Sequence, residues 1–233
     1  MSDKHLSTQF DSELGDISSR VLEIGGMVEA QVQHAIFALL NHDFAAANAA
    51  LTGGDHVNNM EITIDGEFSA IIARRQPAAR DLRLLIVISK ITANLQRVGA
   101  EAEKIARMVK SIIKNGQGQR VPSAELRVAA DLAAAQLRKS LDGFARLDAI
   151  QAVSIVRDDD LIDMEFNGFV RKLITYMMED PRTISTGLDL LFVAKALERI
   201  GDHAKNIAEF TIYLVKGVDV RHLSPDDLQS VVS

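Results

Sequence analysis

The feature that most constrains the fold of this chain is an internal repeat. Residues 95–106 and 197–209 share a pattern in which an arginine, an apolar residue and a glycine follow one another. Pro77 recurs in the same way as Pro181. A repeated helical unit buries its apolar face by stacking on its neighbour, so the sequence predicts two similar units that pack together. The matched residues are Arg97, Val98 and Gly99 in the first copy and Arg199, Ile200 and Gly201 in the second.

Composition favours helices as the elements of both units. The 233 residues include no Trp, four Pro, nine Phe and two Tyr, whereas strands are enriched in aromatic and β-branched residues. Asp43 and Asp148 are predicted N-caps, and glycines 53 and 54 predict a kink or an interruption in the second helix. Two prolines and Gly217 mark helix ends. The six predicted helices span residues 10–40, 43–75, 79–114, 124–147, 148–180 and 183–216.

The predicted fold is therefore all-α, with two tandem, pseudo-symmetric three-helix bundles built from six long helices. The segment 115–123 is rich in Gly and Gln and contains Pro122, which is typical of a linker. The predicted boundaries are residues 1–116 for the N-terminal bundle, 117–123 for the linker, 124–217 for the C-terminal bundle and 218–233 for a C-terminal tail.

The last long helix carries an apolar seam flanked by charge. Small and apolar residues recur there at alternating spacings of four and three, which predicts close packing against another helix at a shallow angle. A charged flank, expected to be exposed, lies to one side of this seam. The seam consists of Leu190, Ala194, Leu197, Gly201, Ala204, Ala208, Thr211 and Val215, and the flank consists of Glu198, Asp202, Lys205 and Glu209.

Charge and hydropathy exclude several classes of function. The net charge of −6 argues against nucleic acid as a partner, because a phosphate backbone attracts basic surfaces. The longest stretch without charged residues, 30–42, is too short and too polar for membrane insertion. The N-terminus has no apolar signal core. The absence of Cys removes disulfides and thiolate sites. A cytoplasmic protein is predicted.

Four carboxylates of the second copy predict a metal site. Asp159 with Asp163, and Glu198 with Asp202, share a helix face at a spacing of four residues. If the two helices are adjacent, these oxygens suit a hard or borderline divalent cation, and His203 or Asn206 would add a ligand. The first-copy positions are Asp55, Asn59, Gln96 and Ala100, so that only Asp55 keeps its charge and is a weak counterpart.

A solvated charged face is the alternative interpretation of the same residues. Lys195, Arg199 and Lys205 are close enough in sequence to neutralise the acids. Enzyme motifs are absent, including the Glu-x-x-His pairs of di-metal bundles, the P-loop and the nucleophile elbow, so no catalytic residue is assigned. A basic segment, residues 74–83, predicts either an anion-binding corner or a solvated turn with local ion pairs.

These motifs together resemble the PhoU family of phosphate-signalling regulators. The resemblance rests on residues 198–204, 206–209, 74–77 and 81–83, with support from 25–29 and 176–180, and it covers nearly the whole chain. It implies two three-helix bundles and a cytoplasmic negative regulator of the phosphate-starvation response. Such a regulator is an adaptor between the ATPase subunit of the phosphate-specific ABC transporter and a sensor histidine kinase, and it modulates phosphate uptake. The family also forms homodimers or higher oligomers.

The resemblance further implies an iron or zinc cluster in each bundle, held by paired acidic motifs. Only the second repeat has the complete set, Asp159, Asp163, Glu198 and Asp202, so one cluster at most is expected, in the C-terminal bundle. The alternative function is a carboxylate-bridged helical bundle with enzymatic or metal-storage activity. A peripheral membrane protein ranks last, because the acidic balance opposes binding to an anionic leaflet.

Overall fold

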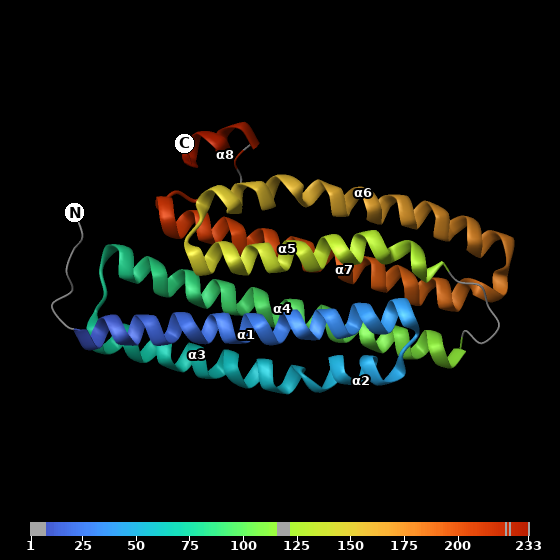
Figure 1. The fold of residues 1–233 in the computed structure, drawn as a ribbon, viewed down its shortest axis with the longest axis horizontal. Coiled ribbons are helices and arrows are strands. Elements are labelled where there is room, and N and C mark those ends of the chain that lie inside the picture. Colours follow the sequence, from blue (N-terminus) through green and yellow to red (C-terminus); the bar gives the residue numbers. More distant parts are fainter. Residues whose placement is uncertain (1–7, 116–121, 222, 224, 233) are drawn as a thin grey trace.

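The regular structure is entirely helical throughout the described part of the chain. The computed structural model describes residues 8–115, 122–221, 223 and 225–232 (Figure 1). This confirms the predicted all-α class. The elements are α1 (Thr8–Asn41), α2 (Phe44–Thr52), α3 (Gly54–Arg75), α4 (Ala79–Asn115), the 3-10 turn η1 (Ser123–Leu126), α5 (Arg127–Arg146), α6 (Ala149–Glu179), the 3-10 turn η2 (Pro181–Thr183), α7 (Ile184–Lys216) and α8 (Pro225–Val232).

Two layers of long helices lie one above the other. Helices α1 to α4 form the lower layer in Figure 1, and α5 to α7 form the upper layer. The most extensive contact between two helices joins α4 and α7, the last helix of each repeat. One apolar core runs through both layers. The repeat units therefore meet along their third helices. Most of the predicted linker falls on residues 116–121, which lie outside the described residues.

The helix boundaries follow the local signals in the sequence. Asp43 caps α2 by accepting a hydrogen bond from the Ala46 amide at 2.9 Å. Asp148 caps α6 in the same way, accepting from the amides of residues 150 and 151. Gly217 ends α7 at a φ of 77°, a conformation that glycine adopts without steric cost. At Gly53 the backbone stays helical although α2 ends and α3 begins there, so the predicted second helix is interrupted but continues in direction.

The seam of α7 is buried as predicted, but its charged flank is not exposed throughout. Seven of the eight seam residues are buried, and Val215 at the end is 39% exposed. On the flank Glu209 is 6% exposed, and Glu198 and Lys205 are half-buried, while Asp202 alone is exposed. The expectation was wrong for Glu209 because α6 packs against this side of α7.

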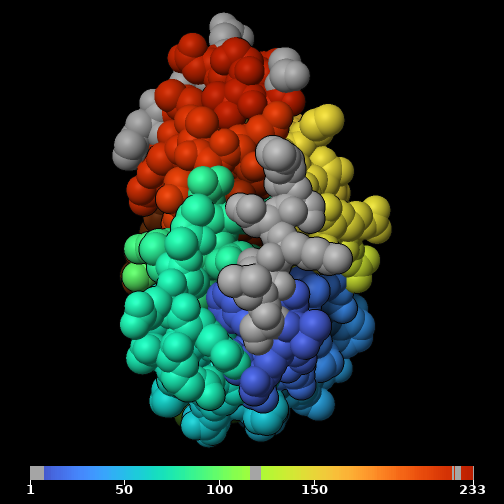
Figure 2. Space-filling model, turned by 90° about the vertical axis from the view of Figure 1, so that its left-hand side faces the viewer, coloured from blue at the N-terminus to red at the C-terminus, as the bar shows by residue number. Residues whose placement is uncertain are grey.

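The C-terminal tail contains a short helix that the sequence analysis did not predict. Helix α8 lies over the second bundle on the side away from α1 (Figure 1), where it contacts α6 and α7. Figure 2 shows the end of the molecule at which the turn into α4, the start of α1 and the end of α7 meet. In the part of the chain that is described, no helix has the length and apolar character needed to cross a membrane.

Candidate metal centre

The four predicted carboxylates come from two adjacent helices of the second bundle. Asp159 and Asp163 lie one turn apart on α6, and Glu198 and Asp202 lie one turn apart on α7. Asp159 is 7% exposed and the Glu198 side chain 13%, whereas Asp163 and Asp202 are exposed. The contact between α6 and α7 therefore places one more buried and one more exposed carboxylate from each helix in the same region.

Burial and mutual repulsion raise the proton affinity of Asp163 and Asp202. Partial burial raises the pKa of Asp202 to about 6, and the charges of Glu198, Asp159 and Asp163 add to this effect. The pKa of Asp163 is also raised, first by burial and then by the charges of Asp159 and Glu198. The four groups are thus close enough to influence one another, and their region favours bound positive charge.

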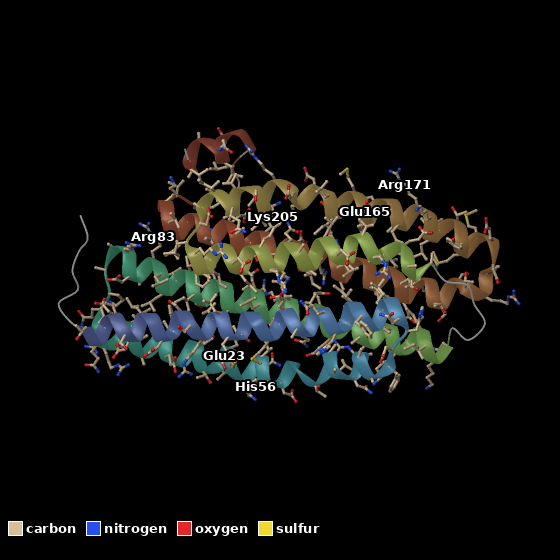
Figure 3. All side chains as sticks on the ribbon, viewed as in Figure 1. Glu23, His56, Arg83, Glu165, Arg171 and Lys205 are labelled. Atoms are coloured by element: carbon tan, nitrogen blue, oxygen red, sulfur yellow. The ribbon has the colours of Figure 1, made fainter. Side chains whose placement is uncertain are left out.

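Two lysines already supply part of that positive charge. Lys205, labelled in Figure 3, donates to Asp159 Oδ2 at 2.8 Å. Lys195 donates to Glu198 Oε1 at 2.6 Å. The second carboxylate oxygen of Glu198, Oε2, is buried and accepts no hydrogen bond. An unpartnered buried carboxylate oxygen is costly, so Glu198 has one oxygen free to bind a cation or a proton donor.

The four carboxylates are chemically suited to bind a metal ion, but their side chains are not arranged to bind one. Carboxylate oxygens in this number suit iron or a hard divalent cation. Within the described ranges, however, no group of three or more His, Asp or Glu side chains is placed so that it could hold a metal ion. A metal would therefore have to displace Lys205 from Asp159 and Lys195 from Glu198 before these carboxylates became ligands.

His203 and Asn206, considered as additional ligands, are engaged by the first bundle. Asn94 on α4 donates through Nδ2 to the Lys90 carbonyl at 2.9 Å, so its Oδ1 is an acceptor. Asn206 donates to this Oδ1 at 3.2 Å, and His203 Nδ1 lies 3.0 Å from it. Burial, followed by the charge of Arg97, lowers the pKa of His203. These two side chains join the second bundle to the first, and in this arrangement they contact α4 and not the acidic site.

A pair of buried glutamines that the sequence analysis missed explains the repeated glycines. Gln31 Nε2 donates to the Ala50 carbonyl at 2.8 Å, and Gln136 Nε2 donates to the Ile155 carbonyl at 3.1 Å, both across 19 residues. A Cβ at Gly99 would lie 3.1 Å from Gln31 Oε1. The signal in the sequence was the recurrence of glutamine at equivalent positions of the two copies, residues 31 and 136.

The contact at Gly201 repeats this arrangement in the second bundle. A Cβ there would lie 3.2 Å from Gln136 Oε1 and 2.6 Å from the Ile162 Cδ1 methyl. The prediction that the glycine permits a close helix approach is therefore confirmed in both copies. The glutamine carboxamide of the first helix in each unit occupies the space that a side chain would need.

The same contacts show which first-bundle residues match the acidic set. Val57 lies next to Gly99 as Ile162 lies next to Gly201. Three residues before them stand Gly54 and Asp159, so Gly54, and not Asp55, is the structural counterpart of Asp159. The copies are therefore offset by 105 residues here, as they are at Gln31 and Gln136, and not by the 104 residues that relate Pro77 to Pro181.

The first bundle replaces the acidic site with neutral and paired groups. Gln96 Nε2 donates to Asn58 Oδ1 at 3.1 Å, which joins two amides where the second bundle has Asp163 and Glu198. Gly54 leaves room for the Glu103 carboxylate, which a Cβ would displace. Asp55 is exposed. The asymmetry predicted between the copies is therefore present in their side-chain contacts.

The basic segment at the turn into α4 forms local pairs. Arg75 donates to both oxygens of Glu13, at 3.0 and 2.8 Å. Arg83, labelled in Figure 3, lies over the Tyr213 ring at 5.6 Å, beside the end of α7. Arg74 donates to the Ala70 carbonyl at 3.2 Å. These contacts favour the solvated turn over an anion-binding corner.

Comparison with protein families and relatives agrees with the two-unit architecture. The PhoU domain model matches the chain twice, at residues 21–109 and 126–211. A "phosphate-specific transport system accessory protein PhoU homolog" from Burkholderia sp is 52% identical over 98% of this chain and 97% of the relative. The "phosphate-specific transport system accessory protein PhoU" of Escherichia coli (strain K12) is 45% identical over 99% of this chain and 95% of the relative.

Solved structures show the same fold. The crystal structure of PhoU from Pseudomonas aeruginosa superposes with a TM-score of 0.86 at 45% identity, covering 90% of this chain and all of that one. The phosphate transport system regulatory protein PhoU from Streptococcus pneumoniae gives a TM-score of 0.82 at 26% identity, covering 91% of this chain and 99% of that one. Two family domains, in tandem and in the expected register, account for nearly all the described helices. The chain belongs to the PhoU family.

Proposed function

We propose that this chain is a cytoplasmic negative regulator of the phosphate-starvation response. It acts as an adaptor between the ATPase subunit of the phosphate-specific ABC transporter and a sensor histidine kinase, and it modulates phosphate uptake. The observation that supports this most is similarity across nearly the full length, through both repeats, to relatives named accessory proteins of the phosphate-specific transport system. No catalytic step is involved, because this is a family of accessory and regulatory proteins without enzymatic activity.

An adaptor of this kind works through a difference in affinity. A protein without a catalytic step shifts a kinase between states only if it binds those states unequally. The long helices offer extended surfaces on both bundles, joined by the α4–α7 contact, so that one bundle is available to each partner. The proposed assembly also includes self-association into a homodimer or higher oligomer.

Deletion of the gene tests the regulatory role. In phosphate-rich medium the deletion strain is expected to express phosphate-starvation genes, and the wild-type gene supplied in trans should restore repression. An unchanged response would contradict the proposal. Pull-down of the tagged protein from phosphate-rich cells tests the partners. We expect the transporter ATPase subunit and the sensor kinase to be recovered, and light scattering of the purified protein gives the oligomeric state.

We also propose that the C-terminal bundle binds one iron or zinc centre through Asp159, Asp163, Glu198 and Asp202. The supporting observation is the unpartnered Glu198 Oε2 among three further carboxylates. When bound, the metal would supply positive charge that replaces the two lysines. Only one such centre is expected, because the structural counterparts of these acids in the first bundle, Gly54, Asn58, Gln96 and Ala100, carry no carboxylate.

Elemental analysis of protein purified without chelator tests the metal centre. We expect stoichiometric metal in the wild type and its loss in the double variant Glu198→Gln and Asp202→Asn. A matched control changes two first-bundle acids, Asp55→Asn and Glu61→Gln, and should retain the metal. Metal that survives the Glu198 and Asp202 changes, or metal-free wild-type protein in iron- and zinc-replete medium, would refute the proposal.

A further inference from the structure

Helix α8 covers an apolar surface of the second bundle that is separate from the main core. Leu228 and Val232 of α8, together with Val220 just before it, pack onto this surface. The surface, which we call the α8 groove, is formed by α6 and α7. Its buried residues are Ala149, Ala152, Val153, Ile155, Ala208 and Ile212.

The cover is a short helix at the end of the chain. Helix α8 has eight residues, whereas an isolated helix shorter than roughly 12–15 residues is marginal in water. Leu228 is 2% exposed and Val232 is 8% exposed, and both belong to the groove cluster and not to the main core. Once released, α8 would therefore lose its helical structure, and docking and folding of this segment occur together.

The first bundle shows that the bundle fold does not require this apolar surface. Phe44 follows the capping residue of α2 as Ala149 follows that of α6, and it is 50% exposed. Lys110 from α4 lies 4.7 Å over the Phe44 ring and donates to Asn48 Oδ1 at 2.8 Å. At the positions of Val153 and Ile212 the first bundle therefore has the polar residues Asn48 and Lys110, and Phe44 beside them is half exposed. The second bundle combines an apolar groove with a short helix that covers it.

The contacts of α8 define what the groove accepts. Leu228 and Val232 are four residues apart and share one helix face. Lys216 at the end of α7 donates through Nζ to the Val232 carbonyl at 3.1 Å, and a cation at this position stabilises the negative end of a helix. The groove therefore recognises the last turns of a helix with two apolar residues at a spacing of four.

We propose that the α8 groove is a docking site for such a helix from a partner protein, and that α8 is its intramolecular competitor. A tethered helix competes at an effective concentration in the millimolar range. A weakly binding partner helix then docks only when α8 has been released or outcompeted. This proposal concerns a site that the regulatory function proposed above does not specify, and it can be tested without either partner of that function.

The test uses a synthetic peptide of residues 218–233 as the docking helix. Binding to full-length protein is followed by NMR through the methyl groups of Ile212 in the groove. The released variant carries Leu228→Ser and Val232→Ser, which weaken the cover and leave the groove intact. The matched control is Ser230→Ala, on the exposed side of α8. We expect the peptide to bind the released variant at least tenfold more tightly than it binds the wild type or the control.

Equal affinity for all three proteins, or no binding to any, would overturn the proposal. If the released variant does not unfold cooperatively, it is not properly folded and its peptide affinity is not informative. Hydrogen exchange of the wild-type protein then tests whether α8 detaches. Amides of residues 228–232 exchanging at least tenfold faster than those of residues 207–212 support a detachable cover, and equal rates exclude it. Light scattering tests whether the groove instead binds α8 of a second copy of this chain. If the protein is a dimer and the peptide dissociates it, the groove is a dimer contact, and the proposal of a partner protein is overturned.

Discussion

Gly201 offers the sharpest test of why the repeated glycine is present. In the variant Gly201→Ala the new Cβ would lie 2.6 Å from Ile162 Cδ1 and 3.2 Å from Gln136 Oε1, both on buried side chains. Relieving this overlap costs ~2 kcal/mol, as in other overpacked cores. Ala returns ~1 kcal/mol of helix propensity. The net expectation is a loss of ~1 kcal/mol, or a fall in Tm of ~2–4 °C for a chain of this size.

The first repeat supplies a matched control for this prediction. At Gly99 the nearest atom to a new Cβ is Gln31 Oε1 at 3.1 Å, and the nearest apolar atom lies at 3.8 Å. Gly99→Ala should therefore change the free energy of unfolding by less than ~0.5 kcal/mol, because the propensity gain offsets a smaller overlap.

A double-mutant cycle of Gly201→Ala with Ile162→Val tests whether the overlap with the Ile162 side chain causes the loss of stability. Removing the Cδ1 methyl costs ~1 kcal/mol by itself. It also removes the overlap, so the double variant should be more stable than the sum of the single effects by ~1 kcal/mol. Urea unfolding of the four proteins measures these values. Additive effects, or a Gly201→Ala variant at least as stable as Gly99→Ala, would refute the reasoning.

Three further predictions concern the acidic region and a helix cap. Because the pKa of Asp202 rises from 3.8 in the unfolded chain to about 6 in the fold, its charge destabilises the folded state as pH increases through this window. At pH 7 the Asp202→Asn variant should therefore unfold at a higher urea concentration than the wild type. The gain in free energy of unfolding should be up to ~1 kcal/mol after allowance for solvent screening, and it should vanish below pH 4. An effect that does not change with pH would contradict this reasoning. Lys205→Met removes the ion pair of the buried Asp159 carboxylate and should cost ~2 kcal/mol at pH 7 in the same unfolding assay. Lys195→Met, at a lysine 42% exposed, should cost less than ~1 kcal/mol, and equal costs for the two variants would contradict the difference in burial. Asp148→Ala removes the cap of α6 and should lower Tm by ~2–4 °C in calorimetry, and no change in Tm would exclude a capping role.

Much of the fold could be read from local sequence. The caps at Asp43 and Asp148 and the stop at Gly217 lie where the sequence predicts them, because capping depends on residues within one turn. The seam of α7 was also predictable, because helical periodicity is a property of the segment itself. The repeated arginine and glycine identified the two units, and the resemblance of the flanking motifs indicated the PhoU family.

The candidate site was less accessible from sequence. The four carboxylates were predictable as residues that share helix faces, and the structure places them in one region. The pairing of Lys195 with Glu198 follows from their spacing of three residues on one helix, whereas the pairing of Lys205 with Asp159 depends on how α7 packs against α6. His203 points toward α4 and not toward the acids for the same reason. The docking of α8 also depends on contacts between segments far apart in the chain.

By itself, the sequence determined that this protein has two helical units with an acidic set in only one of them. Tertiary structure decided which side of each helix is covered. Glu209 is buried although its own helix gives it the pattern of an exposed residue. Gly54, and not Asp55, matches Asp159, because the helix contacts at Gly99 and Gly201 set the register between the repeats here. Periodicity and capping act within a turn, whereas burial and register depend on the neighbouring helix, which a local pattern does not specify.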